Sequence, residues 1–353
     1  MTDDRTAETT SATRRIRLRG IAQVIFGLAA LALVFVKSDT RALLDTVRNT
    51  QLAYLPLAAL GSFAVTWLMA ARWGLILGVR PNRPPTARLF AHYLVGLFFT
   101  NFVPGGGVSG DVARLIYVDR EIQDKPFVLS TLVYERLVGV FILLLIGVGA
   151  TLGSGALGQS RRTIGLVEAV LIIAFVVSAA LMSRRVTRFL SHVATLVGAR
   201  LGLERFASAL GRTLSAISQM KFHRGMMIGT LALSITIRVV WSLGCYVVAR
   251  AMALPLPLIT VFSFMSIVDL IRLLPISVGG LGVREWVMVA LFASVGLSRE
   301  QALSFSLLVF APVYLNAIAG GLIYLARAGA VTRAEEGAKG RRGEGATGDL
   351  LTR

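Results

Sequence analysis

The chain has 353 residues, of which 55% are hydrophobic and only 16% are charged, whereas apolar residues make up about 45–50% of a typical soluble domain. This composition excludes a soluble protein with a polar surface and predicts a protein integral to a membrane. Lysine and arginine exceed acidic residues by 18, but they lie mostly between apolar runs, where they orient membrane helices and contact anionic headgroups. Nucleic acid is therefore not an expected partner.

Apolar runs long enough to cross a membrane, about 20 residues, recur along the chain. Residues 1–14 are polar and predict a disordered cytoplasmic N-terminus, and the first apolar run lacks a small-residue cleavage site, which favours a retained helix. Residues 15–328 are expected to form one integral membrane domain, followed by a disordered cytoplasmic tail, 329–353. Six runs predict full spans: Ile21–Val36, Leu52–Leu77, Phe127–Leu152, Ile164–Met182, Met226–Val248 and Leu303–Leu325.

Two other apolar runs are broken by similar motifs, PGGGVSGDVAR (104–114) and PISVGGLGVRE (275–285). In each, a proline stops a half-helix, glycines permit a tight turn, and a new helix begins with one acid and one base. Such turns cannot face lipid and are expected to line a wet cavity, although glycines can also simply permit close helix packing. The residues predicted to build the turns are Pro104, Gly105, Gly106, Gly107, Gly110, Pro275, Gly279, Gly280 and Gly282.

Basic clusters orient these elements, because cytoplasmic loops are enriched in lysine and arginine. With the clusters at 14–19, 80–88, 114–125, 183–224 and 327–342 all cytoplasmic, each broken segment must enter and leave by one face. The predicted fold is an all-α, polytopic membrane helix bundle with about six full spans and two oppositely entering re-entrant hairpins, in pseudo-symmetric inverted halves. Both termini are expected to be cytoplasmic at the inner membrane, with an amphipathic stretch of the 183–224 loop on the headgroup surface.

Ionisable residues inside or next to apolar runs are the candidate substrate-binding residues, since each costs about 2.5–3.5 kcal/mol to insert. Pairs such as Glu135 with Arg238, or Asp269 with Arg272, are expected, and they either fix helix register or form a polar cavity for a lipid headgroup. Helix starts near Ser109 and Gly282 favour an anion, which arginines could bind as phosphate. The candidates are Asp111, Arg114, Glu135, Arg136, Arg238, Asp269, Arg272, Arg284 and Glu285.

Metal ligands and cofactor motifs are not evident in the sequence. The one cysteine, Cys245, lies in an apolar run, and His92, His192 and His223 are far apart. No HExxH pair or Walker A motif occurs. We therefore expect no metal, no cofactor and no ATP-driven transport by this chain alone.

Three motifs in order, 104–114, YERLVG at 134–139, and 275–285, resemble the lysylphosphatidylglycerol synthase transmembrane family, also called the flippase-like domain family. The resemblance covers roughly residues 15–328. It implies a domain that moves lipids between leaflets: aminoacylated phosphatidylglycerol in the two-part bacterial resistance factor, and polyprenyl-linked sugars, hopanoids or cardiolipin in association with other members. Only about 25 polar residues follow Leu325, so the soluble aminoacyl-transferase domain of the two-part enzymes, and with it synthase activity, is expected to be absent.

The sequence therefore favours a non-enzymatic lipid translocase whose partners are membrane lipids, anionic or phosphate-bearing, with a homo-oligomer or a lipid-synthesis protein as further partners. One alternative is a non-catalytic partner of a lipid-synthesis complex, docking through the 183–224 loop. The other is an intramembrane lipid-modifying transferase. Its available acids would be Asp111, Glu135, Asp269 and Glu285, but no DxD or histidine-containing metal cluster accompanies them.

Overall fold

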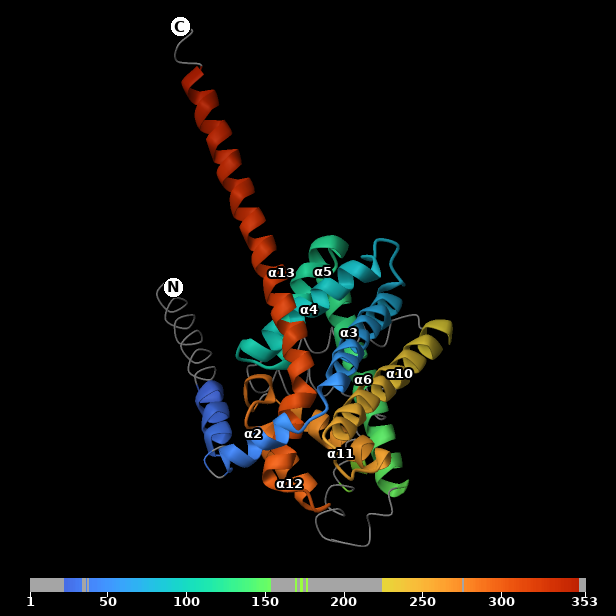
Figure 1. Cartoon of the computed structure of the whole chain (residues 1–353). Helices are drawn as coiled ribbons and strands as arrows, with labels where there is room; N and C mark the ends of the chain where they lie inside the picture. The colour runs from blue at the N-terminus through green and yellow to red at the C-terminus, as the bar shows by residue number, and fades with distance from the viewer. Residues whose placement is uncertain are drawn as a thin grey trace, which may run out of the picture.

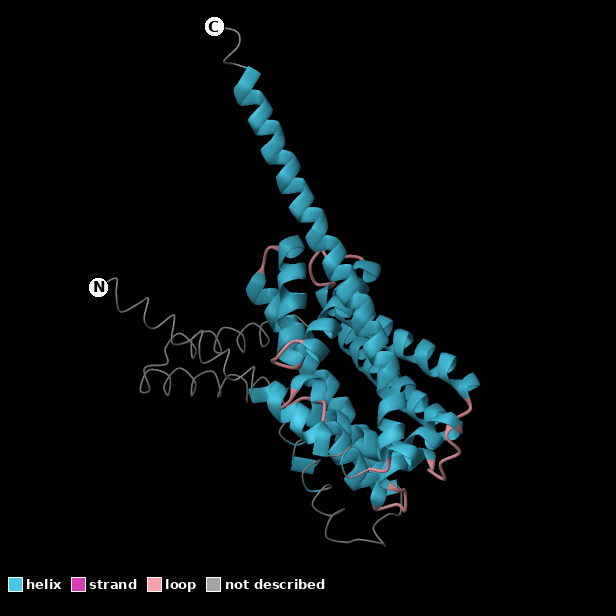
Figure 2. Ribbon diagram, turned by 60° about the vertical axis from the view of Figure 1, so that its left-hand side comes forward, coloured by secondary structure: helices cyan, strands magenta, loops and turns pink. Residues whose placement is uncertain are grey.

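The computed structural model describes residues 22–33, 36, 38–153, 169, 172–173, 176, 224–274 and 276–348, and every regular element among them is helical (Figures 1 and 2). The N-terminal segment 1–14, most of the expected span Ile164–Met182, the 183–223 loop and Pro275 lie outside the described residues. After a short apolar helix, Ala22–Leu33, the elements are α2 (Thr40–Arg48), η1 (Leu52–Tyr54), α3 (Leu55–Leu77), α4 (Thr86–Phe102), α5 (Gly107–Ile122), α6 (Lys125–Gly153), α10 (Arg224–Ala251), α11 (Leu258–Arg272), η3 (Val278–Gly280), α12 (Val283–Ala293) and α13 (Arg299–Gly348).

Four of these helices are long and apolar enough to cross a membrane, namely α3, α6, α10 and the first part of α13, Arg299–Arg327. They correspond to four of the six predicted full spans. Large apolar side chains remain exposed on their outer faces, such as Leu60 on α3 and Ile228 on α10, as expected for helices that contact lipid. The chain is therefore an all-helical, multi-pass membrane protein.

The first predicted break is a turn between α4 and α5. The backbone is extended at Val103, and Gly105 and Gly106 follow with φ of +111° and +56°, a region that side chains other than hydrogen strongly disfavour. After the turn, α5 packs directly on α4: a Cβ added to Gly110 would lie 2.5 Å from the carbonyl oxygen of Gly96. Gly110 thus serves close helix packing, Gly105 and Gly106 make the turn, and Gly107, also predicted for the turn, is the first residue of α5.

The second predicted break lies between α11 and α12 and uses the same backbone solution. Gly279, Gly280 and Gly282 have φ of +60°, +79° and +81°, so the chain reverses through conformations that favour glycine. The helix after this turn, α12, has only 11 residues. Figure 1 draws α4 and α5 in the upper part of the bundle and α12 at its lower end.

The two glycine turns meet inside the bundle. A Cβ on Gly279 would lie 3.1 Å from Cα of Asn101, near the end of α4, and one on Gly106 would lie 4.0 Å from the carbonyl oxygen of Ser277. Residues more than 170 positions apart in sequence are therefore neighbours. The glycines at this contact, Gly106, Gly279 and Gly280, are buried, whereas Pro104 and Ile276 at the outer ends of the turns are exposed.

The short helix Ala22–Leu33 covers both turns from one side. The amide N–H of Gly105 donates to the Gln23 side-chain oxygen at 3.0 Å. A Cβ on Gly27 would lie 3.2 Å from Cβ of Ser277, and one on Gly282 would lie 2.4 Å from the Gly27 carbonyl oxygen. This helix therefore contacts the turns of both helical hairpins, the helix pairs α4–α5 and α11–α12.

The last helix, α13, connects the two hairpins and then leaves the bundle. A Cβ on Gly320 would lie 1.8 Å from the carbonyl oxygen of Leu94, so the backbones of α13 and α4 are in direct contact. Beyond Arg327 the helical backbone continues to Gly348, although composition predicts disorder from residue 329. Extending a formed helix needs no new nucleation, and in Figures 1 and 2 this end projects alone from the bundle.

Candidate functional site

A cavity of about 330 Å³ lies between the two hairpins and the membrane-length helices. Side chains from the middle of α3, α6, α10 and α13 line it, together with Gly106 and Gly107 of the first turn and Gly279 and Gly280 of the second. Seven of the nine predicted site residues contribute to its wall: Asp111, Arg114, Glu135, Arg136, Arg238, Asp269 and Arg272.

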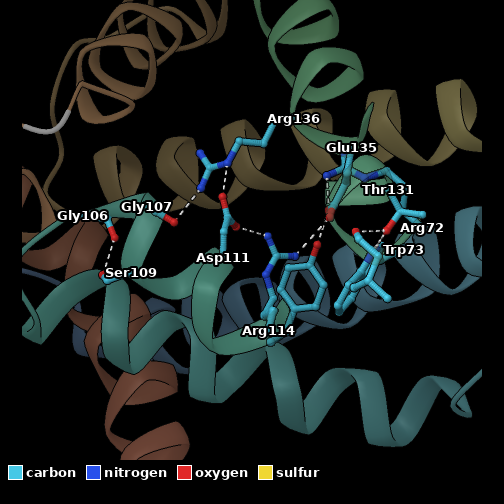
Figure 3. Close-up of polar contacts among 12 residues, drawn as sticks. Arg72, Trp73, Gly106, Gly107, Ser109, Asp111, Arg114, Thr131, Glu135 and Arg136 are labelled. Atoms are coloured by element: carbon cyan, nitrogen blue, oxygen red, sulfur yellow. Dashed lines mark hydrogen bonds and ion pairs between the residues drawn. The ribbon is translucent and has the colours of Figure 1, made fainter. Parts of the chain in front are cut away.

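The first charged cluster is centred on Glu135 of α6 (Figure 3). Its carboxylate accepts hydrogen bonds from Arg72 of α3 at 2.8 Å, from Arg114 of α5 at 3.1 Å, and from the Tyr93 hydroxyl of α4. Arg72 also donates to the hydroxyl of Ser234 on α10 at 3.0 Å. Side chains of four helices therefore meet at one buried carboxylate in a mostly apolar helix, and Arg72 connects a fifth helix, α10, to this group.

Asp111 extends this cluster toward the first glycine turn. It accepts hydrogen bonds from Arg114 and from Arg136, and Arg136 also donates to the carbonyl oxygen of Gly107 at 2.9 Å. The Arg114 guanidinium lies over the ring of Tyr93, 4.2 Å from its centroid, an arrangement that stabilises a desolvated cation. Figure 3 shows the result, a row of alternating arginine and carboxylate side chains from Arg136 to Arg72.

The second charged cluster is centred on Asp269 of α11, across the cavity. Its carboxylate accepts from Arg238 of α10, from the indole N–H of Trp241 at 2.9 Å, and from Arg272 at 3.4 Å. Arg238 donates in addition to the Ser266 hydroxyl at 3.1 Å. The predicted pair of Asp269 with Arg272 is therefore formed, whereas the suggested pair of Glu135 with Arg238 is wrong, because each of these side chains has its partners on its own side of the cavity.

The remaining two predicted site residues, Arg284 and Glu285, form a separate pair at the start of α12 and do not line the cavity. Both are fully buried, and Glu285 also accepts from the amide N–H of Gly282 at 2.7 Å. The Arg284 guanidinium lies over the ring of Phe310, 3.9 Å from its centroid. The start of α12 is thus capped by its own glutamate, and the arginine is held by that glutamate and an aromatic ring.

The comparisons with known proteins agree with the motifs that build this cavity. The family model for the lysylphosphatidylglycerol synthase TM region matches residues 20–320. The chain belongs to this family. It is 21% identical over 296 residues to a UPF0104 membrane protein of Methanothermobacter thermautotrophicus, covering 79% of this chain and 87% of the relative.

A second UPF0104 membrane protein, from Methanocaldococcus jannaschii, is 28% identical over 125 residues, which cover 35% of this chain and 36% of the relative. No solved structure matches this member of the family.

Several cavity residues were missed in the sequence analysis. Arg72 carries the same signal as Glu135, a charge inside an apolar run, but its position near the end of that run concealed its role. Asn316 is a polar residue within α13, and its side-chain N–H group donates to Ser62 and Thr66 of α3 at 3.0–3.2 Å. Tyr93 has no comparable signal, because a tyrosine in an apolar helix is ordinary core composition.

The cavity wall is more positive than negative. Among the described residues that line it there are five arginines and three carboxylates, and the side-chain nitrogens Nε of Arg72, Arg238 and Arg272 have no hydrogen-bond partner within the described part of the chain. These three nitrogens are enclosed by protein atoms, but the excess of guanidinium groups on the wall favours a ligand that accepts hydrogen bonds and carries negative charge. No group of three or more histidine, cysteine or acidic residues suited to a metal ion occurs within the described ranges.

Proposed function

We propose that this protein is a lipid translocase, which moves a phospholipid or another polar-headed lipid between leaflets without changing it chemically. One observation carries the proposal: a cavity of about 330 Å³, lined by five arginines and three carboxylates, at the middle of four membrane-length helices. Charges at this depth are costly, and in membrane proteins they commonly mark a substrate pathway. Because arginines outnumber carboxylates, an anionic or phosphate-bearing headgroup is the expected ligand.

In this proposal α4–α5 and α11–α12 are re-entrant hairpins that enter from opposite faces. Their helices have 17, 16, 15 and 11 residues and reach roughly 17–26 Å at 1.5 Å per residue, less than a hydrocarbon core of about 30 Å. The contact between their tips supports this arrangement. With the predicted spans Ile21–Val36 and Ile164–Met182, the bundle has six full spans in inverted halves, a plan typical of transporters.

The proposed orientation places both termini in the cytoplasm at the inner membrane, because basic residues gather at one end of the described bundle. Arg327, at the end of the α13 span, lies over the ring of Tyr117 on α5, 5.4 Å from its centroid. Arg120 of α5 lies over the same ring, and Arg88 of α4 pairs with Glu121 at 2.7 Å. The positive-inside rule assigns such a cluster to the cytoplasmic face.

Transport would use the ion pairs of the cavity as exchangeable contacts. A headgroup phosphate that enters the cavity accepts hydrogen bonds from guanidinium groups that otherwise point to carboxylates, while the acyl tails stay in the bilayer. Glu135, Asp111 and Asp269 then keep the arginines charged and oriented before and after the lipid passes. Rocking of the two hairpin-bearing halves would expose the cavity first to one leaflet and then to the other.

Leaflet exchange in proteoliposomes tests the proposal. Vesicles with a trace of fluorescent phospholipid are treated with dithionite, which quenches only the outer leaflet unless lipids exchange. Gly139 lines the cavity, with a Cβ at this site 3.6 Å from a terminal nitrogen of Arg72, so Gly139→Leu should fill the cavity and slow exchange. Gly149→Leu on the same helix is the matched control, because nothing lies within 4 Å of its added Cβ.

The expected result is full quenching with wild type and with Gly149→Leu, and half quenching with a folded Gly139→Leu protein. If wild type accelerates no phospholipid class, the translocase proposal is wrong and a role as partner in a lipid-synthesis complex gains support. If mass spectrometry finds that the lipid is chemically altered, the protein is an intramembrane transferase and not a translocase.

A further inference from the structure

The arginines of the cavity outnumber the carboxylates, and the two kinds of side chain are paired in a regular pattern. Each carboxylate serves two arginines: Glu135 contacts Arg72 and Arg114, Asp111 contacts Arg114 and Arg136, and Asp269 contacts Arg238 and Arg272. The described wall therefore carries two more positive than negative charges. In a bundle of membrane helices such an excess is unfavourable until an anion compensates it.

Two of the five arginines differ from the others in their freedom to meet a ligand. The side chains of Arg136 and Arg272 are 38% and 20% exposed, against 7–9% for the remaining three. The contact of Arg272 with Asp269 is long, 3.4 Å, and its guanidinium otherwise lies over the ring of Phe310, 4.5 Å from the centroid. These two arginines therefore present the most accessible side chains of the five to a ligand, and a ligand would compete with the bonds of Arg136 to Asp111 and to the Gly107 carbonyl oxygen.

Each of these arginines packs against one glycine turn. A Cβ added to Gly107 would lie 2.6 Å from a terminal nitrogen of Arg136, and one added to Gly280 would lie 3.1 Å from Cγ of Arg272. The two turns contact one another, and both arginines line the same cavity. The absence of a side chain at both turns thus creates the space in which one guanidinium from each half of the molecule reaches the cavity.

We propose that Arg136 and Arg272 form a subsite for a phosphate monoester headgroup, which carries close to two negative charges. This inference rests on the proposed lipid translocase and names its substrate class. A monoester has three terminal oxygens and about −1.5 to −2 charge near neutral pH, so it matches the excess on the wall and can accept hydrogen bonds from both guanidinium forks. A phosphodiester headgroup carries one charge and leaves one positive charge uncompensated.

Binding of short-chain lipids to the purified full chain tests this subsite. Dihexanoyl phosphatidic acid, dihexanoyl phosphatidylglycerol and inorganic phosphate are titrated at pH 8, with tryptophan fluorescence as the readout because Trp241 lines the cavity. Phosphatidic acid should bind about tenfold or more tightly than phosphatidylglycerol, as expected for additional charge-assisted hydrogen bonds. Arg136→Gln and Arg272→Gln should each bring this ratio toward one, whereas the exposed Arg250→Gln should leave it unchanged.

Three outcomes overturn the inference. Affinities for the two lipids within about twofold of each other would remove the preference for a monoester. A preference that survives in both folded variants would place the subsite elsewhere. Inorganic phosphate binding as tightly as phosphatidic acid would assign the site to free phosphate rather than to a lipid.

Leaflet exchange of acyl-labelled phosphatidic acid and phosphatidylglycerol separates this inference from the proposed function. Equal acceleration of both lipids leaves the translocase standing and contradicts the monoester subsite. Selective binding without exchange of either lipid contradicts the translocase and retains the subsite.

Discussion

The two hairpins have the same backbone plan but use their charged residues differently. In the first, the helix after the turn carries Asp111 and Arg114 into the cavity wall. In the second, the corresponding residues Arg284 and Glu285 pair with each other outside it. The charges of the second half come instead from α11, the helix before the turn, and from Arg238 of α10. Similar motifs therefore predict similar turns, while the neighbours of each helix decide which side chains face the cavity.

The largest expected difference between the hairpins concerns their turns. Gly282→Ala forces a side chain into a φ of +81° and places its Cβ 2.4 Å from the Gly27 carbonyl oxygen. We expect a loss of about 1–3 kcal/mol from the strained backbone and a further loss of about 1–3 kcal/mol from overpacking. Gly105→Ala shares the positive φ but its Cβ has no contact closer than 3.5 Å. Thermal unfolding in detergent should therefore show the larger decrease for Gly282→Ala, and equal decreases would contradict this comparison.

The next largest effect concerns leaflet exchange, and it distinguishes the Arg284–Glu285 ion pair at the start of α12 from the ion pairs of the cavity. Replacing both partners of a buried ion pair is often neutral, and the double variant Arg284→Met/Glu285→Gln retains an acceptor for the Gly282 amide. We expect its leaflet exchange to stay within about twofold of wild type because neither residue lines the cavity. The double variant Asp111→Asn/Arg136→Gln should instead lose exchange. Lost exchange in a stable Arg284→Met/Glu285→Gln protein would assign that pair to the transport pathway.

The smallest effect compares two tryptophans, one beside each charged cluster. Trp73→Phe removes a hydrogen bond to the Thr131 hydroxyl and should lower the free energy of unfolding by about 1 kcal/mol with exchange retained. Trp241→Phe removes one of the three donors to Asp269 and should slow exchange as well. Denaturant unfolding and the quenching assay measure the two effects, and a similar exchange rate in both variants would argue against a role for Asp269 in transport.

Local chemistry explains why the two breaks were predictable. Proline stops a helix and glycine permits a backbone with positive φ wherever they occur, so the breaks at 104–107 and 279–282 follow from a few consecutive residues. The same is true of Glu135 and Arg238, whose charges stand out in apolar helices. Neither signal depends on which helices lie nearby.

The pairing of charges was not predictable in the same way. Asp269 and Arg272 are one helical turn apart, so their contact follows from helix geometry. Glu135 contacts Arg72 and Arg114, from helices 63 and 21 residues away, and nothing local distinguishes these arginines from Arg238. The choice depends on how helices pack around the cavity.

The sequence by itself determined the membrane class, the four membrane-length helices, the two breaks and most of the charged residues of the cavity, because hydropathy, glycine and proline act over short distances. Only the tertiary structure decided that the two turns meet, that Arg72 and Tyr93 join Glu135, and that Arg284 and Glu285 stay outside. Those features depend on contacts between helices such as that of Gly320 with Leu94. Such contacts arise from the joint packing of distant segments, which no short stretch of sequence specifies.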